Sequence, residues 1–182
     1  LDIYPQSDGA IAMIVTTEDR ARELTDRPVC IAGVANCYNS FYLGDRNLSD
    51  DAALREAGAR AFKMAGIKKP ADELDLVELA AQYSYQELLW PECLGLVADG
   101  KAGGWIESGA THFGGRLPIN VSGGMLAGNP LLLGGLARAA ECFLQLRGEA
   151  GERQVEGAEL ALCQGSTGPA SQHHCVMILS AK

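Results

Sequence analysis

The chain has 182 residues, of which 47% are hydrophobic and 21% are charged, which is enough apolar material for one well-buried core. Its net charge of -8 argues against nucleic acid as a partner, because that kind of binding depends on basic contacts to phosphates. No apolar run reaches the roughly 18 residues of a membrane span and no signal peptide is recognisable, so we expect a cytoplasmic protein.

The first residues predict a strand followed by a short helix. Residues 10–15 form an apolar run that fits a buried strand, and Thr16 with Asp19 three places on is a helix-capping pattern. An arginine and a proline follow this strand–helix unit, and we place a boundary there. The sequence therefore predicts two parts, residues 1–27 and residues 28–182.

Apolar runs and helical periodicity alternate after this boundary. Residues 29–35 predict a second strand, and Ser49 is positioned to cap the helix that comes next. Apolar residues recur at helical spacing over 54–65, and Gly66 and Pro70 then end that helix. The pattern is that of an α/β protein.

The alternation continues to the end of the chain. Residues 74–79 predict a third strand, and residues 83–96 predict a helix that Pro91 should break or restart. Residues 131–146 predict a helix so apolar on all sides that it should lie in the interior. Two further apolar runs predict strands at residues 159–163 and 175–180. We expect a layered α-β-α fold in which helices cover a mixed sheet.

A glycine-rich turn precedes the apolar helix. Asn129 and Pro130 form a good helix start signal, because asparagine favours the N-cap and proline the first helical position. The nearby Gly123, Gly124 and Gly128 fit a turn in which the backbone closely approaches either another segment or a ligand.

The cysteines and histidines predict no metal site. None of the six cysteines belongs to a CxxC motif, and most of them are expected to be small buried hydrophobic residues. His173 and His174 begin the last strand, so their rings should point to opposite faces and cannot easily bind one metal ion.

Four stretches, in this order, resemble the second half of a thiolase. They are "SDGAIAMIVTTEDRAREL" (7–24), "GGRLPINVSGG" (114–124), "GNP" (128–130) and "QLRGEAGERQV" (145–155). The branch they resemble most is that of the sterol-carrier-protein, lipid-transfer-protein and archaeal acyl-CoA thiolases. The resemblance implies a five-layered fold of two similar halves, with 1–27 as the last strand–helix unit of the N-terminal half and 28–182 as the C-terminal half.

The resemblance also implies a nucleophilic cysteine that lies in the first half of such enzymes, outside this sequence. The chain begins at Leu1 rather than at a methionine and soon enters an apolar run. We therefore expect a fragment, a cleaved product or one half of a split enzyme.

Two of the three catalytic elements that a thiolase C-terminal half supplies are altered here. Where a polar pair should follow the third strand, the chain has Ala80 and Ala81, with Tyr83 and Tyr85 just beyond. A phenol at either position could supply a proton or a hydrogen bond instead. Where the histidine of a Gly-His-Pro motif should accept the proton of the nucleophilic cysteine, the chain has Asn129, which cannot act as a base near neutral pH.

The third element, a cysteine followed one residue later by glycine, is present. It is matched by Cys163 and Gly165, and the resemblance implies that Cys163 acts as acid and base on the attacking carbon. The residues after Gly165 predict a turn whose backbone N–H groups could hold an oxyanion. Asn120 and Ser122 match positions that shape the floor of the site, and with Gly124 and Gly165 they are predicted to bind substrate.

Three functions follow from this reading. The first is a thiolase-like acyltransferase that forms or cleaves carbon–carbon bonds on a coenzyme A thioester through Cys163 and Asn129. The second is a retro-aldol lyase of the lipid-transfer-protein type, in which Tyr83 or Tyr85 takes over and a β-hydroxyacyl-CoA is cleaved without an acyl-enzyme. The third is a non-catalytic thiolase-like subunit.

The cofactor and partner predictions are common to all three functions. We expect no tightly bound cofactor, with the acyl-CoA acting as substrate. The resemblance implies a homodimer, a small zinc-ribbon and OB-fold partner protein, and a separate N-terminal half.

Overall fold

The computed structural model describes residues 2–181. Its strands are β1 (Cys30–Tyr38), β2 (Leu76–Leu79), β3 (Leu160–Thr167) and β4 (His173–Ser180). Its α-helices are α1 (Glu18–Leu24), α2 (Ala52–Ala65), α3 (Pro70–Glu73), α4 (Gln86–Cys93), α5 (Ala102–Glu107), α6 (Gly124–Ala127) and α7 (Gly134–Arg147). Short 3₁₀ turns lie at η1 (Leu43–Asp45), η2 (Leu131–Leu133) and η3 (Gly151–Arg153).

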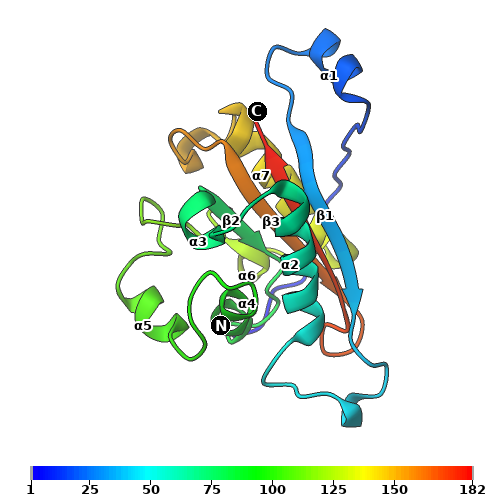
Figure 1. Cartoon of the computed structure of the whole chain (residues 1–182), viewed down its shortest axis with the longest axis vertical. Helices are drawn as coiled ribbons and strands as arrows, with labels where there is room; N and C mark the ends of the chain where they lie inside the picture. Colours follow the sequence, from blue (N-terminus) through cyan, green and yellow to red (C-terminus); the bar gives the residue numbers. More distant parts are fainter. Residues whose placement is uncertain (1, 182) are drawn as a thin grey trace.

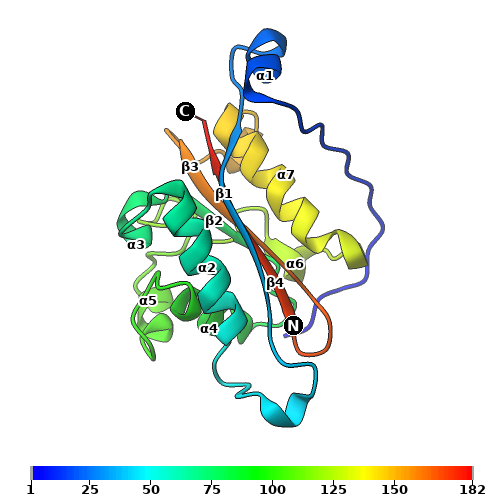
Figure 2. The same cartoon turned by 45° about the vertical axis from the view of Figure 1, so that its right-hand side comes forward.

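The four strands form one mixed sheet in the order β1-β4-β3-β2. β4 runs antiparallel to both β1 and β3, whereas β2 and β3 run parallel. Figure 1 shows α2 and α4 in front of the sheet, and Figure 2 shows α7 on its other side. The predicted α-β-α layering with a mixed sheet is confirmed.

Two separate apolar clusters fill the two sides of the sheet. On one side, α2 and α4 bury residues such as Leu54, Phe62 and Trp90 against the strands. On the other side, α7 packs Cys142 and Leu146 onto β2 and β3. Each helix is therefore held by the apolar stripe that it turns toward the sheet.

Helix α2 confirms its predicted periodicity but not its predicted cap. Its N-cap is Asp51, whose carboxylate accepts a hydrogen bond from the Leu54 backbone N–H at 3.2 Å, so the prediction of Ser49 is wrong. The helix ends at Gly66, which adopts a left-handed conformation with φ of 75°. Helix α4 includes Pro91 and continues to Cys93, so that proline does not break it.

Helix α7 differs from its prediction in two ways. It begins at Gly134, five residues after Asn129, and therefore Asn129 is not its N-cap. It is also not buried on all sides, since Leu136 is 37% exposed, while the charged residues Arg138 and Glu141 are buried. The helix covers one face of the sheet.

The predicted strand at residues 10–15 is wrong. This segment is extended but forms no ladder, and Ile14 and Val15 are 94% and 77% exposed. A strand needs a neighbour to pair its backbone groups, and no described segment runs beside this one. Helix α1 follows it as predicted, but its N-cap is Thr17, whose side chain makes no capping hydrogen bond, so the predicted cap at Thr16 is wrong. The division of the chain into 1–27 and 28–182 stays a prediction.

Candidate functional site

The carboxyl ends of β2 and β3 meet at one edge of the sheet. The two strands are parallel, and Leu79, the last residue of β2, lies opposite Gln164. The chain therefore leaves β2 toward Tyr83 at the same edge where β3 continues past Gly165. This places two of the three predicted catalytic elements at one end of the sheet.

The N-terminal segment brings the third element to the same edge. The backbone N–H of Tyr4 donates to Gln82 O at 3.2 Å, close to Tyr83. Farther along, the Asn129 N–H donates to Pro5 O at 3.3 Å, and the Ser7 N–H donates to Asn129 O at 3.2 Å. A few residues of extended chain, about 10 Å, thus separate the tyrosine segment from Asn129.

Tyr83 and Tyr85 lie at the open side of this edge. Tyr83 is half-buried between Tyr4 and Tyr85, with ring centroids 6.1 Å away in both cases. The Tyr85 ring is nearly parallel to that of Tyr83, at an interplanar angle of 15°, and Tyr85 is 52% exposed. Both phenols are thus within reach of a molecule that binds at this edge.

Asn129 is buried, with an exposed fraction of 2%, and its side-chain oxygen has no hydrogen-bond partner among the described residues. A buried carbonyl without a partner costs roughly 1–3 kcal/mol, so it is a group that a ligand donor would satisfy. Ser166, on the last part of β3, also has a buried hydroxyl without a partner.

Cys163 is buried one residue before Gln164, which lies opposite the last residue of β2. It is 4% exposed, belongs to the apolar cluster beneath α7, and its thiol contacts Met177 O at 3.7 Å. In the same cluster, burial and the neighbouring Cys163 thiol raise the pKa of the Cys142 thiol well above its usual range.

Gly165 and the residues after it also differ from expectation. Residues up to Thr167 still belong to β3 and pair with β4, so the predicted turn at this point is wrong. A Cβ atom on Gly165 would lie 3.0 Å from the Gly135 Cα of α7. The small residue is therefore needed for the close approach of strand and helix, and its role in substrate binding stays a prediction.

Asn120, Ser122 and Gly124 form a framework at the end of β2. The Asn120 side chain accepts from Leu79 N at 2.7 Å and donates to Glu87 at 2.6 Å. Its own φ of 55° is unusual for a residue other than glycine. The Ser122 hydroxyl accepts from Gly124 N at 3.1 Å, which fixes the turn that follows.

A fully buried carboxylate supports this framework. Glu78 accepts hydrogen bonds from the Ser122 backbone at 3.0 Å and from its hydroxyl at 2.6 Å. The Arg138 guanidinium lies 3.4 Å from the carboxylate, but its Nε and Nη1 have no hydrogen-bond partner among the described residues. Burial raises the pKa of Glu78, and Arg138 and Ser122 counteract that shift only in part.

The sequence analysis missed several polar residues that hold the site segments. Gln86 accepts from Gln82 N and Tyr83 N at 2.7 and 3.1 Å, and it donates to Ser171 at 3.2 Å. Gln164 accepts from Ala80 N at 3.0 Å. Gln164 could have been suspected from its place inside the Cys-Gln-Gly motif, whereas no local sequence pattern indicates Gln86.

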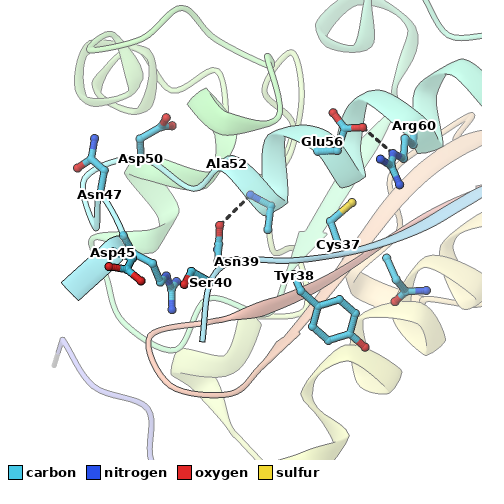
Figure 3. A pocket seen from close by; sticks show the side chains of 13 residues that line it. Cys37, Tyr38, Asn39, Ser40, Asp45, Asn47, Asp50, Ala52, Glu56 and Arg60 are labelled. Atoms are coloured by element: carbon cyan, nitrogen blue, oxygen red, sulfur yellow. Dashed lines mark hydrogen bonds and ion pairs between the residues drawn. The ribbon is translucent and has the colours of Figure 1, made fainter. Parts of the chain in front are cut away.

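The structure also contains a groove that none of the predicted site residues lines. It has a volume of about 670 Å³ and lies between the end of β1 and the start of α2 (Figure 3). Asn39, Asp50 and Arg60 are among the residues that line it, and Tyr38, which stacks on His173, stands at its side.

Within residues 2–181, no three His, Cys, Asp or Glu side chains cluster closely enough to hold a metal ion. In the same range, no helix has the length and apolar character needed to cross a lipid bilayer.

This fold and these converging segments are those of a thiolase-like protein. Residues 37–181 match the family model described as "Thiolase C-terminal domain-like". The chain belongs to this family.

Two curated relatives and one solved structure are informative. The chain is 43% identical to the acetyl-CoA acetyltransferase of Methanothermobacter thermautotrophicus, over 96% of this chain and 46% of the relative. It is 34% identical to the 17-hydroxy-3-oxo-4-pregnene-20-carboxyl-CoA lyase of Mycobacterium tuberculosis, over 92% of this chain and 44% of the relative. The chain therefore spans less than half the length of these relatives.

The solved structure is the Ltp2–ChsH2(DUF35) aldolase. It aligns with a TM-score of 0.73 and 23% identity, covering 90% of this chain and 42% of that one. This likeness supports the fold.

Proposed function

We propose that the chain is the C-terminal half of a lyase that cleaves a β-hydroxyacyl-CoA by a retro-aldol reaction. One observation carries the proposal: the phenols of Tyr83 and Tyr85 and the unpartnered oxygen of Asn129 converge on one edge of the sheet. The polar groups at this edge can move or hold protons, but none of them is a nucleophile.

A retro-aldol reaction needs only such groups. The β-hydroxyl of the substrate loses its proton, and the bond between the α and β carbons breaks. A carbonyl product leaves, and the thioester enolate takes up a proton at its α carbon. We assign one of these two proton transfers, at the β-hydroxyl or at the α carbon, to Tyr83. Tyr85 is the more exposed of the two tyrosines.

Asn129 has a binding role in this proposal. Its unpartnered oxygen would accept the hydrogen bond of the substrate hydroxyl and so orient it for deprotonation. A site that binds a hydroxyl in this way would discriminate strongly against an acyl-CoA that lacks it, since the buried oxygen would then stay unpaired.

A thiolase-type acyltransferase is the second candidate, and the 43% identity to an acetyl-CoA acetyltransferase favours it. That reaction requires a nucleophilic cysteine and a base, and because Asn129 cannot act as that base, the N-terminal half would have to supply both. In this case Cys163 would have to become accessible to the attacking carbon.

An assembly with further chains is part of the proposal. The aldolase of similar fold is a complex of Ltp2 with ChsH2(DUF35), and the relatives are about twice as long as this chain. We propose that this chain likewise works with a thiolase-like N-terminal half, as a homodimer, and with a small zinc-ribbon and OB-fold partner.

The test measures turnover of β-hydroxyacyl-CoA by the full-length protein and its variants. Tyr83→Phe or Tyr85→Phe is expected to lower kcat by about 10²- to 10⁴-fold, whereas Cys163→Val leaves it within about threefold. Tyr42→Phe, which changes an exposed tyrosine in the loop after β1, is the matched control.

Three results would contradict the proposal. If Cys163→Val abolishes turnover and both tyrosine variants are active, the acyltransferase is the better reading. If acyl-CoA binds without any turnover, or does not bind at all, the chain is a non-catalytic subunit.

A further inference from the structure

A buried row of hydrogen-bonded side chains runs from the start of α2 over β4 and β3 to the end of β2. His174, on β4, has an exposed fraction of 0%, and both of its ring nitrogens are engaged. Its Nε2 lies 2.8 Å from Asp51 Oδ2, and its Nδ1 lies 2.9 Å from the Gln164 side-chain nitrogen. The other end of Gln164 accepts the hydrogen bond of Ala80 N at 3.0 Å.

The direction of every bond in this row is determined. The Ala80 backbone N–H can donate only to the oxygen of the Gln164 amide, so Gln164 must turn its Oε1 to Ala80 and its NH₂ group to His174. The Nδ1 of His174 is therefore an acceptor, and its proton is on Nε2, from which it is donated to Asp51.

Asp51 is a firm acceptor at the far end of the row. It also accepts from Asn39 Nδ2 at 2.8 Å and from Leu54 N at the start of α2. Burial acts to raise the pKa of Asp51, but hydrogen bonds from His174 and Asn39 outweigh it and hold that pKa below its usual value. Trp90 packs against the His174 ring in a T-shaped arrangement, with 5.4 Å between centroids, and so limits its rotation.

We propose that His174 is a positioning residue that, through Gln164, fixes the Ala80–Tyr83 segment on which the proposed reaction depends. The chain of bonds joins the start of α2, strands β4 and β3, and the first residue after β2. It therefore sets where the tyrosine segment leaves the sheet. This inference rests on the proposed function only for its effect on turnover.

Two variants of similar shape separate the hydrogen bond of His174 to Gln164 from its hydrogen bond to Asp51. In His174→Asn, the amide oxygen replaces Nδ1 and still accepts from Gln164, but the bond to Asp51 is lost. In His174→Gln, the longer amide reaches Asp51, but the acceptor for Gln164 is lost. If His174 served stability alone, the two variants would behave alike.

The experiment compares both variants in the full-length protein, with His173→Asn as the matched control. His173 is the neighbouring residue on the opposite face, where its ring bonds Asn36 and stacks on Tyr38. For His174→Gln we expect amide exchange at residues 80–83 to accelerate about tenfold or more, with exchange in β3 and β4 unchanged. We expect kcat to fall about 10- to 100-fold with little change in KM.

His174→Asn and His173→Asn are expected to keep wild-type exchange at residues 80–83 and kcat within about threefold. A second route, Gln164→Met, removes both bonds of Gln164 and should match His174→Gln. Equal exchange and equal kcat in His174→Asn and His174→Gln would overturn the proposal. Because exchange requires no substrate, a positive exchange result without any turnover in the wild-type protein would reject the proposed function and retain the positioning role.

Discussion

The two faces of the sheet bury charged groups in opposite ways. On the α2 face, Asp51 and His174 belong to a chain in which each polar atom has a partner. On the α7 face, Glu78 and Arg138 lie 3.4 Å apart, and the guanidinium leaves two nitrogens without a partner among the described residues. A fully satisfied network fixes geometry, whereas a partly satisfied one mainly costs desolvation energy.

The comparison indicates which face carries the geometry of the site. The α2 face is connected bond by bond to Ala80, and so to the tyrosine segment. The α7 face supports the turn at Ser122, but through a carboxylate whose charge is poorly compensated. We therefore expect the two faces to respond differently to mutation and to acid.

Removing Asp51 should have the largest effect on stability. Asp51→Ala removes the partner of a buried histidine and the N-cap of α2 together, and we expect the free energy of unfolding to fall by about 3–5 kcal/mol. Asp50→Ala is the matched control, since Asp50 is bonded to Arg55 and its side chain is 42% exposed. That change should cost under about 1 kcal/mol in the same urea titration. Similar losses for the two variants would contradict the comparison.

The pair on the α7 face should show a smaller loss that a second substitution reverses. Glu78→Gln leaves Arg138 buried beside a neutral side chain, and we expect a loss of about 2–3 kcal/mol because the glutamine can retain a hydrogen bond with Ser122. Adding Arg138→Met removes the uncompensated charge, and the double variant should recover to within about 1 kcal/mol of wild type. Unfolding free energies that simply add would show that the two charges do not interact.

Much of the fold could be predicted from local patterns. The helical spacing of Leu54, Ala57 and Ala61 predicted α2, and the apolar runs at 159–163 and 175–180 predicted β3 and β4 with ends two to four residues short. These elements bury an apolar stripe against a partner, and the sequence records that stripe directly. The apolar run at 10–15 carries the same signal, yet no described segment pairs with it.

The candidate site was less predictable because its contacts are long-range. His174 and Asp51 are 123 residues apart, and Gln164 and Ala80 are 84 residues apart. No local spacing indicates such pairs. Family resemblance drew attention to Cys163, but whether that residue faces a site or the core depends on how α7 lies over β3.

The smallest and most specific difference between the faces should appear in the dependence of stability on pH. The pKa of Asp51 is lower in the folded state than in the unfolded chain, so its contribution is complete above the unfolded pKa of about 4 and is lost as pH falls through the folded pKa. The pKa of Glu78 is raised in the folded state. Its contribution is therefore greatest below the unfolded pKa of about 4 and is lost as pH rises through the folded pKa.

Urea unfolding between pH 3 and pH 7 would separate these two effects. Below about pH 4, protonation of Asp51 lowers the free energy of unfolding of the wild-type protein. Asp51→Asn lacks this carboxyl, so its free energy of unfolding should fall less steeply with pH in this range. The double variant Glu78→Gln, Arg138→Met should instead remove a gain that wild type makes as pH falls from 7 toward 4. Parallel curves for all three proteins would mean that neither carboxyl changes its proton affinity on folding, and the contrast between the faces would then lie in packing alone.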